Sequence, residues 1–188
     1  VLKLGILQGD FISFETHTRI LNNGYIKSRY LDDKLCVAQI LSYIKFLKDN
    51  RLKPKTDLYV YFSNYEEIGH GVSVFPEELD EFIAVDIGLV AGEDAHVDEK
   101  KMQIIAKDSR STYDFTLRKK LQETADKNGI KYTVGVYNRY GSDATTAILQ
   151  GFDFKYACIG PNVDATHHYE RCHNDGIIET VKLLIAYL

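Results

Sequence analysis

The chain has 188 residues, of which 45% are hydrophobic and 27% are charged, as in an ordinary globular domain. Its net charge of −4 comes from 23 basic and 27 acidic residues that are mixed along the sequence, which argues against nucleic acid as a partner. The sequence contains no apolar run of about 18 residues, so we expect no membrane span and no membrane partner. The three cysteines are widely spaced and do not resemble a disulfide framework, so we expect a cytoplasmic protein.

The first 27 residues are typical of short strands joined by turns. Residues 4–7 and 11–14 are two strand candidates. Residues 19–21 and 25–26 flank Asn22-Asn23-Gly24, which is a hairpin signal. A segment with this small number of strands is not stable alone. We therefore expect it to belong to a larger β unit or to pack on the rest of the chain.

A helix that ends near Asn50 follows, and two aspartates fall in its first turn. The apolar residues recur at helical spacing, namely Leu35, Ala38, Ile40, Leu41, Ile44 and Leu47. Asp32 and Asp33 stand where aspartate commonly caps a helix and interacts with its dipole. Capping and metal ligation therefore both stay open, and one residue can serve each role.

Strands and helices alternate along the rest of the chain. The predicted strands cover residues 58–62, 82–88, 102–106, 131–136 and 154–159, and the predicted helices cover 113–128, 141–149 and 177–188. Polar loops are expected at residues 91–101, with His96, and at residues 164–173. This alternation predicts an α/β fold, a three-layer α/β/α sandwich with a mostly parallel, mixed sheet.

Two adjacent carboxylates, Glu66 and Glu67, follow the predicted strand at residues 58–62. Ligand sites of open α/β sheets gather at the carboxyl ends of strands. Neighbouring carboxylates on an irregular segment can point in different directions, so one can bind a metal while the other moves a proton. The alternative is a solvated acidic turn, because isolated acidic residues are mostly exposed.

Further candidate ligands lie at the ends of later strands. Asp86 interrupts an apolar run, where a charge is costly unless it is paired or binds a metal. An exposed edge strand with Asp86 facing water is the alternative. His167 and His168 stand in the histidine-rich loop. Oxygen and imidazole ligands together suit zinc, cobalt or manganese.

Other chemistries have little support in the sequence. The nucleophile elbow, the P-loop and the dinucleotide fingerprint are all absent. His167, Cys172 and His173 could form a local zinc knot, but no second pair of cysteines accompanies them.

Seven segments along the chain follow the pattern of one known family, namely GDFISFE, IKSRYLDDK, FSNYEEIGHG, AVDIG, YGSDAT, ATHHYERCH and VKLLIAYL. Through them the chain resembles the tetrahedral aminopeptidase family. These are co-catalytic metallopeptidases that are also described as glutamyl or deblocking aminopeptidases and, misleadingly, as endoglucanases. The matching segments cover nearly the whole chain and correspond to the C-terminal half of such enzymes. The resemblance implies a zinc-exopeptidase-like fold.

The resemblance also implies a role for each matching residue. Asp32 would bridge two metal ions, Glu67 and His167 would be ligands, and Asp86 would be a ligand of the other ion. Glu66 would be the general base.

The G-[ST]-D turn lies near the substrate in such enzymes, which points to Ser142 and Asp143. Capping of the helix that starts there explains either residue equally well.

The family's domain organisation implies that residues 1–27 are the tail of a β-rich dimerisation domain. Residues 28–188 would then be the C-terminal part of the catalytic domain. The family has a further histidine ligand upstream of the β domain, and His17 does not fit that motif. The metal site formed by Asp32, Glu67 and His167 could therefore be complete, whereas the metal site that contains Asp86 would lack one ligand.

The implied function is a metal-dependent aminopeptidase that acts on short peptides with two divalent ions, zinc or cobalt. Its implied assembly is a homo-oligomer in which dimers build a dodecamer. The alternative is a truncated or degenerate relative that acts as a non-catalytic metal-binding or assembly domain. A carbohydrate-active hydrolase would need two carboxylates that flank a sugar bond, which the histidine and Asp86 argue against.

Overall fold

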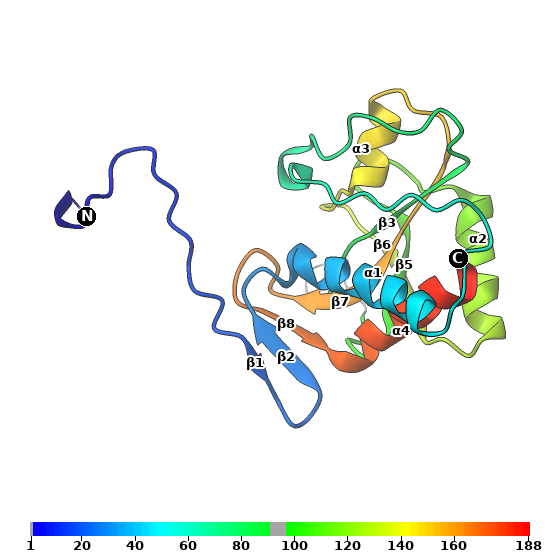
Figure 1. Ribbon diagram of the computed structural model, residues 1–188, viewed down its shortest axis with the longest axis horizontal. Helices are drawn as coiled ribbons and strands as arrows, with labels where there is room; N and C mark the ends of the chain where they lie inside the picture. Colours follow the sequence, from blue (N-terminus) through cyan, green and yellow to red (C-terminus); the bar gives the residue numbers. More distant parts are fainter. Residues whose placement is uncertain (1, 91–96) are drawn as a thin grey trace.

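The computed structural model describes residues 2–90 and 97–188, which build a mixed sheet with helices on both of its faces (Figure 1). The part of the predicted polar loop at residues 91–96, with His96, lies outside the described residues, as does residue 1. The hydrogen-bonded order is β1-β2-β8-β7-β5-β6, and both β3 and β4 pair with β7. The strands are β1 (Arg19–Ile20), β2 (Tyr25–Ser28), β3 (Glu81–Val85), β4 (Gly88–Leu89), β5 (Met102–Lys107), β6 (Tyr132–Val136), β7 (Lys155–Asp164) and β8 (Glu170–His173).

Parallel pairing joins β3 and β4 to β7 and joins β5 to β6, and the other pairs are antiparallel. The α-helices are α1 (Leu31–Asp49), α2 (Phe115–Lys127), α3 (Asp143–Leu149) and α4 (Asn174–Tyr187). Two short 3-10 helices, η1 (Leu2–Leu4) and η2 (Glu66–Ile68), complete the described elements. The predicted α/β class and mixed sheet are confirmed. Within the part of the chain that the structure describes, no helix has the length and apolar character needed to cross a bilayer.

The alternation of side chains along the central strands creates the layers. Ile104 of β5 packs in a core with residues of α1, α2 and α4, whereas its neighbour Ile105 packs with Ala144 of α3 and with tyrosines. Cys158 of β7 lies with Ile105, and the adjacent Ile159 lies with Ile104. Three helices thus cover one face of the sheet and α3 covers the other, as the three-layer prediction requires.

The predicted hairpin at Asn22-Asn23-Gly24 is confirmed. It joins β1 to β2, and β2 continues into the main sheet through antiparallel pairing with β8. Gly24 adopts a φ of 88° and lies against the ring of His173, which begins α4 as its N-cap. The hairpin is therefore packed against α4. The assignment of residues 1–27 to a separate dimerisation domain stays a prediction.

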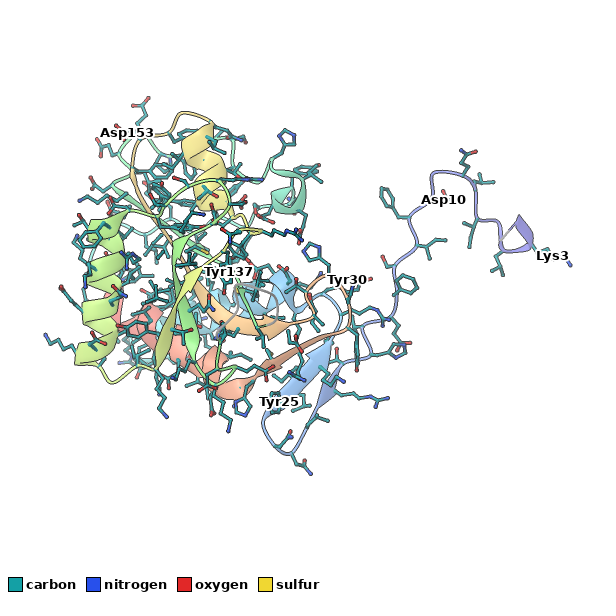
Figure 2. All side chains as sticks on the ribbon, turned by 180° about the vertical axis from the view of Figure 1, so that it is seen from behind. Lys3, Asp10, Tyr25, Tyr30, Tyr137 and Asp153 are labelled. Carbon is teal, nitrogen blue, oxygen red and sulfur yellow. The ribbon has the colours of Figure 1, made fainter. Side chains whose placement is uncertain are left out.

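The strands predicted at residues 4–7 and 11–14 are absent. Residues 3–13 form an exposed arm that extends away from the sheet (Figures 1 and 2), and Phe11 is fully exposed. Residues 14–18 return to the domain, where the carbonyl of Thr16 accepts a hydrogen bond from the N–H of Arg29. A short segment becomes a strand only where a neighbouring strand completes its hydrogen bonds, and none of the described strands pairs with residues 4–7 or 11–14.

Two further predictions were wrong. Residues 58–62 are not a buried strand but an irregular segment, in which Leu58 packs on the core and Tyr59 is 67% exposed. These residues take part in no described strand pairing, so the segment does not form a strand although its residue types favour one. The loop predicted at residues 164–173 contains β8, which lies between β2 and β7.

Replacement of Gly24 with alanine should destabilise the protein more than the same change at Gly129. Both glycines have positive φ, so each substitution costs about 1–2 kcal/mol through the left-handed backbone. A Cβ at Gly24 would lie 2.7 Å from Nε2 of His173, whereas a Cβ at Gly129 would meet nothing within 4 Å. Overpacking should add about 1–3 kcal/mol at Gly24 only. Urea denaturation measures both losses, and equal losses would contradict the packing of His173 on the hairpin.

Candidate metal centre

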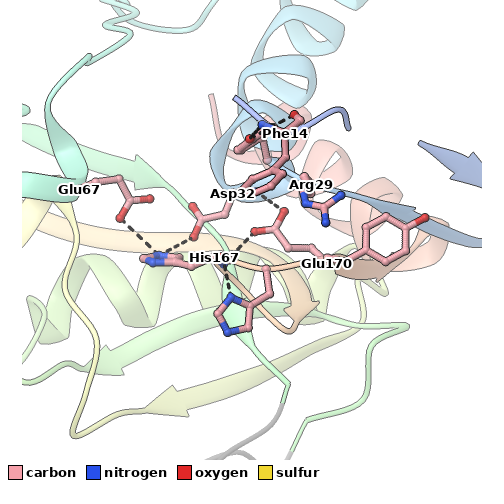
Figure 3. Close-up of a pocket in the computed structure, with 9 residues that line it drawn as sticks. Phe14, Arg29, Asp32, Glu67, His167 and Glu170 are labelled. Carbon is pink, nitrogen blue, oxygen red and sulfur yellow. Dashed lines mark hydrogen bonds and ion pairs between the residues drawn. The ribbon is translucent and has the colours of Figure 1, made fainter. Parts of the chain in front are cut away.

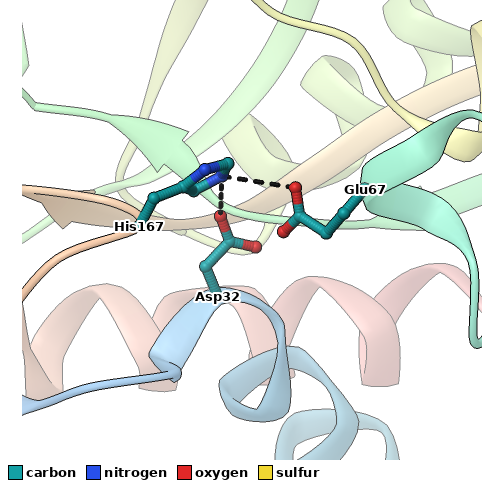
Figure 4. Close-up of side chains that lie close together, drawn as sticks. All are labelled: Asp32, Glu67 and His167. Carbon is teal, nitrogen blue, oxygen red and sulfur yellow. Dashed lines mark ion pairs between the residues drawn. The ribbon is translucent and has the colours of Figure 1, made fainter. Parts of the chain in front are cut away.

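Three side chains from distant parts of the chain meet at one point. Asp32 lies at the start of α1, Glu67 lies in η2, and His167 lies in the loop between β7 and β8. Nε2 of His167 is 3.5 Å from Oδ2 of Asp32 and 3.3 Å from Oε2 of Glu67 (Figure 4). One potential ligand atom from each residue lies within 4.8 Å of the other two, which is a spacing that a single ion could bridge.

A second group of potential ligands shares Asp32 with the first. It consists of Asp32, Asp33 and Asp86, again with ligand atoms within 4.8 Å of one another. Asp86 directly follows β3, and its Oδ1 accepts a hydrogen bond from the Ile87 N–H at 2.6 Å. Asp86 is partly buried, so the alternative of an aspartate that faces water on an edge strand is not what the structure shows.

These carboxylates repel one another in a partly dry environment. Burial, followed by the charges of Glu67 and Glu170, raises the pKa of Asp32 to about 6. Burial is also the main cause that raises the pKa of Asp33 to about 8, and it raises the pKa of Asp86 well above its ordinary value. A bound cation would remove this repulsion.

The residues present fit a divalent metal ion. The donors are carboxylate oxygens and one imidazole, which zinc and cobalt accept. Oδ1 of Asp33 is buried and has no hydrogen-bond partner, so it is free to bind a cation. Asp32 belongs to both groups, as a residue that bridges two ions would.

Glu170 fixes the backbone that carries two of these ligands. Its Oε2 accepts hydrogen bonds from the N–H groups of Leu31 and Asp32, the latter at 3.2 Å. Its Oε1 accepts from the N–H of His167 at 3.2 Å. The Glu170 side chain is buried, with 1% of the residue exposed, and Figure 3 shows it between the two segments.

The start of α1 does not use either aspartate as a cap. Tyr30 is the N-cap residue, with a φ of 63°, and its own side chain makes no cap hydrogen bond. The carboxyl group of Glu170 accepts the first N–H groups instead, so the Asp32 side chain is left to face the metal centre. The predicted capping role for Asp32 and Asp33 is therefore not observed.

Glu66 stands beside the metal centre but belongs to neither group of ligands. Burial, followed by the charges of Asp143 and Glu67, raises the pKa of Glu66 to about 7. Glu66 is partly buried and Glu67 is exposed, so the two adjacent carboxylates occupy different environments. A carboxyl group with a pKa near neutral is suited to accept and release a proton.

A cavity of about 450 Å³ opens next to Asp32, Glu67 and His167 (Figure 3). Its remaining lining residues are aromatic, basic or polar, namely Phe14, Arg29, Tyr30, His168, Tyr169 and Glu170. The cavity therefore offers both an aromatic wall and access to the metal centre.

Ser142 and Asp143 have contacts within the protein. Ser142 is buried, and its Oγ lies 2.8 Å from the hydroxyl of Tyr113. Oδ2 of Asp143 accepts a hydrogen bond from Oγ of Ser63 at 2.6 Å. Neither residue lines the cavity, and the substrate-binding role of both stays a prediction.

Glu170, which supports this site, was not predicted from the sequence, whereas Asp33, which the sequence left open between a cap and a ligand, joins the second group. Glu170 stands in the quoted ATHHYERCH segment, but its spacing gave no sign of burial. The structure brings His167 rather than His168 to Asp32. Neither ligand group in the described residues contains Cys172 or His173, so the zinc-knot alternative gains no support.

Comparison with known proteins identifies the family. A family model described as M42 glutamyl aminopeptidase matches residues 1–183. YhfE of Bacillus subtilis, which carries a provisional aminopeptidase name, is 41% identical over 187 residues, which are 99% of this chain and 54% of YhfE. The chain thus spans about half the length of this curated relative.

Two solved structures share the fold. The TET1 peptidase of Pyrococcus horikoshii, which assembles into a tetrahedron or an octahedral shell, is 25% identical with a TM-score of 0.75, over 92% of this chain and 52% of that chain. The aminopeptidase APDkam598 of Desulfurococcus kamchatkensis is 21% identical with a TM-score of 0.85, over 99% and 55% of the two chains.

Replacement of Glu170 with alanine should weaken both the fold and metal binding. It leaves the N–H groups of Leu31, Asp32 and His167 without their acceptor, and the buried Leu31 group alone should cost about 1–3 kcal/mol. Loss of a residue that orients ligands typically lowers metal affinity by about 10–100-fold. Glu99→Ala is the matched control, because Glu99 is also a nearly buried carboxylate but pairs with Arg171 away from the metal centre. Zinc titration calorimetry should show weaker binding only in Glu170→Ala, and equal affinity in both variants would contradict the supporting role.

Proposed function

The chain belongs to the M42 glutamyl aminopeptidase family, and from this premise we propose that it is the catalytic part of a metal-dependent aminopeptidase. It would remove N-terminal residues from short peptides. The observation that carries this proposal is the convergence of Asp32, Glu67 and His167 beside Glu66 at the mouth of a cavity.

We propose that one divalent ion binds Asp32, Glu67 and His167, and that a second binds Asp32 and Asp86. Asp33 lies within reach of this second position. Bound zinc or cobalt would supply Lewis acidity, which lowers the pKa of water and stabilises negative charge on the carbonyl oxygen.

Glu66 is the proposed general base. Its pKa near neutral and its position next to Glu67, outside both ligand groups, support this role. Glu66 takes a proton from the attacking water as the water oxygen bonds to the carbonyl carbon of the first peptide bond. The same carboxyl then returns the proton to the leaving nitrogen as the carbon–nitrogen bond breaks.

The substrate and the assembly follow from the same family membership. The cavity lined by Phe14, Tyr30 and Tyr169 would receive the N-terminal residue of the peptide. We further propose a homo-oligomer built from dimers, and a dodecamer in the intact enzyme, as the dodecamer and the shells of the P. horikoshii relative suggest. A cytoplasmic setting is supported by the three buried cysteines, all of which are free thiols.

Replacement of Glu66 with glutamine should abolish turnover and leave the metal in place. The amide keeps the size of the side chain but cannot accept the proton, so hydrolysis of a peptide anilide should fall by about 10²–10⁴-fold. Glu67→Gln, by contrast, should lower the zinc content. Elemental analysis together with initial rates separates the two variants. Activity retained in Glu66→Gln would remove Glu66 from the role of base.

Removal of metal should abolish hydrolysis reversibly. After dialysis against a chelator, addition of zinc or cobalt should restore activity and raise the melting temperature, because an ion that binds only the folded state stabilises it. A protein that regains metal and melting temperature but hydrolyses no peptide would instead be the non-catalytic metal-binding domain.

A further inference from the structure

Both ends of the loop that carries Glu66 and Glu67 contact one carboxylate. At the start of the loop, the hydroxyl of Ser63 donates a hydrogen bond of 2.6 Å to Oδ2 of Asp143. At its end, Gly71 lies so close to Asp143 that a Cβ there would be 2.0 Å from Oδ1. The Asp143 carboxylate therefore lies between the two ends of the loop and contacts both of them.

The loop makes few other contacts before its buried end at Gly71 and Val72, apart from the pair between Glu67 and His167. None of the residues of η2, Glu66–Ile68, is buried, and Tyr65 and Ile68 are exposed. The hydrogen bonds from the N–H groups of Ile68, Gly69 and His70 end on carbonyl groups of the loop itself. The segment that leads into the loop takes part in no strand pairing among the described residues. Among residues 63–70, therefore, neither a buried side chain nor strand pairing of the described chain places Glu66 and Glu67.

Asp143 itself is held firmly. It is the first residue of α3, directly after Ser142, which forms a capping box with Thr145. Beneath them lies Asp108, which is fully buried and accepts hydrogen bonds from the hydroxyls of Tyr113 at 2.9 Å and Thr145 at 2.8 Å. The N-terminal end of α3 is thus anchored in the interior.

Arg110 provides a second contact between this anchor and the loop. Its N–H donates to Asp108 at 2.8 Å, and its guanidinium donates to the hydroxyl of Thr146 in α3. The same guanidinium lies next to Gly69 at the end of η2, where a Cβ would be 3.7 Å from Nη2. Arg110 therefore lies between α3 and the turn that follows Glu67.

We propose that Asp143, assisted by Arg110, is a positioning residue that fixes the loop from Ser63 to Gly71 and thereby the places of Glu66 and Glu67. Its catalytic consequence rests on the proposed aminopeptidase function, whereas the placement of the loop does not. A displacement of about 1 Å in a catalytic group can cost about 10²-fold in rate. A loop with few buried side chains therefore needs a contact of this kind to hold Glu66 and Glu67 in place. This role differs from substrate contact, because Asp143 faces the loop and does not line the cavity.

The first test removes the hydroxyl of Ser63. In Ser63→Ala we expect faster amide hydrogen exchange in residues 63–71, zinc affinity lowered about tenfold, and kcat lowered about tenfold with KM changed less than twofold, as the loss of a charge-assisted hydrogen bond predicts. Ser42→Ala is the matched control, because Ser42 is a hydroxyl donor on the exposed side of α1 and bonds the carbonyl of Ala38 at 2.7 Å. The control should behave as the unmodified protein.

The second test is a double-mutant cycle between Gly71 and Asp143. Gly71→Ala should loosen the loop strongly, because its Cβ overlaps the Asp143 carboxylate. In an Asp143→Ala background the carboxylate is gone, so Gly71→Ala should add little further loss of zinc affinity. Asp143→Asn can still accept a hydrogen bond from Ser63, so it should retain most of the zinc affinity. It provides a comparison with the unmodified protein if Asp143→Ala does not fold.

Three outcomes would overturn the proposal. The first is unchanged exchange and zinc affinity in Ser63→Ala and Gly71→Ala, and the second is full additivity in the cycle. The third is a rise in KM alone, which would assign Asp143 to substrate contact. Exchange and zinc affinity do not require turnover, so a protein without peptidase activity would refute the aminopeptidase function but still decide whether Asp143 positions the loop.

Discussion

The candidate metal centre depends on the buried carboxylate of Glu170. This group accepts N–H donors from the start of α1 and from the β7–β8 loop, so one side chain sets the relative position of Asp32 and His167. His167 adopts a φ of 64°, an uncommon conformation for a residue with a side chain, and the bond from its N–H to Glu170 helps to hold it there. The ligands therefore meet because a buried acceptor organises the backbone on either side of them.

The same centre concentrates negative charge at a cost to the fold. Burial raises the pKa values of Asp32, Asp33 and Asp86, which means that their ionised forms are less stable here than in water. A cation bound among them would relieve that repulsion, so metal binding would also stabilise the fold. Functional sites commonly conflict with stability in this way, and the surrounding packing of the sheet compensates for it.

Two parts of the chain carry apolar residues that the described structure does not bury. Tyr59 and Phe62 lie in an irregular segment, and Phe11 lies on the extended arm. Both segments have strand-forming sequences, but a strand needs the hydrogen bonds of a neighbour before its side chains can pack. Because the chain spans about half the length of the relatives that it matches, its contacts describe the C-terminal half of the family's fold.

The sequence by itself determined the α/β class, the hairpin at Asn22-Asn23-Gly24 and most of the helices and strands, because these depend on local periodicity and turn chemistry. The motifs also singled out Asp32, Glu67 and His167, which the structure brings together. Only the tertiary structure decided that residues 58–62 stay irregular, that β8 forms, and that Glu170 and Asp143 hold the segments of the site. These features arise from contacts between residues far apart in the chain, and burial and proximity of that kind leave no local pattern in a single sequence.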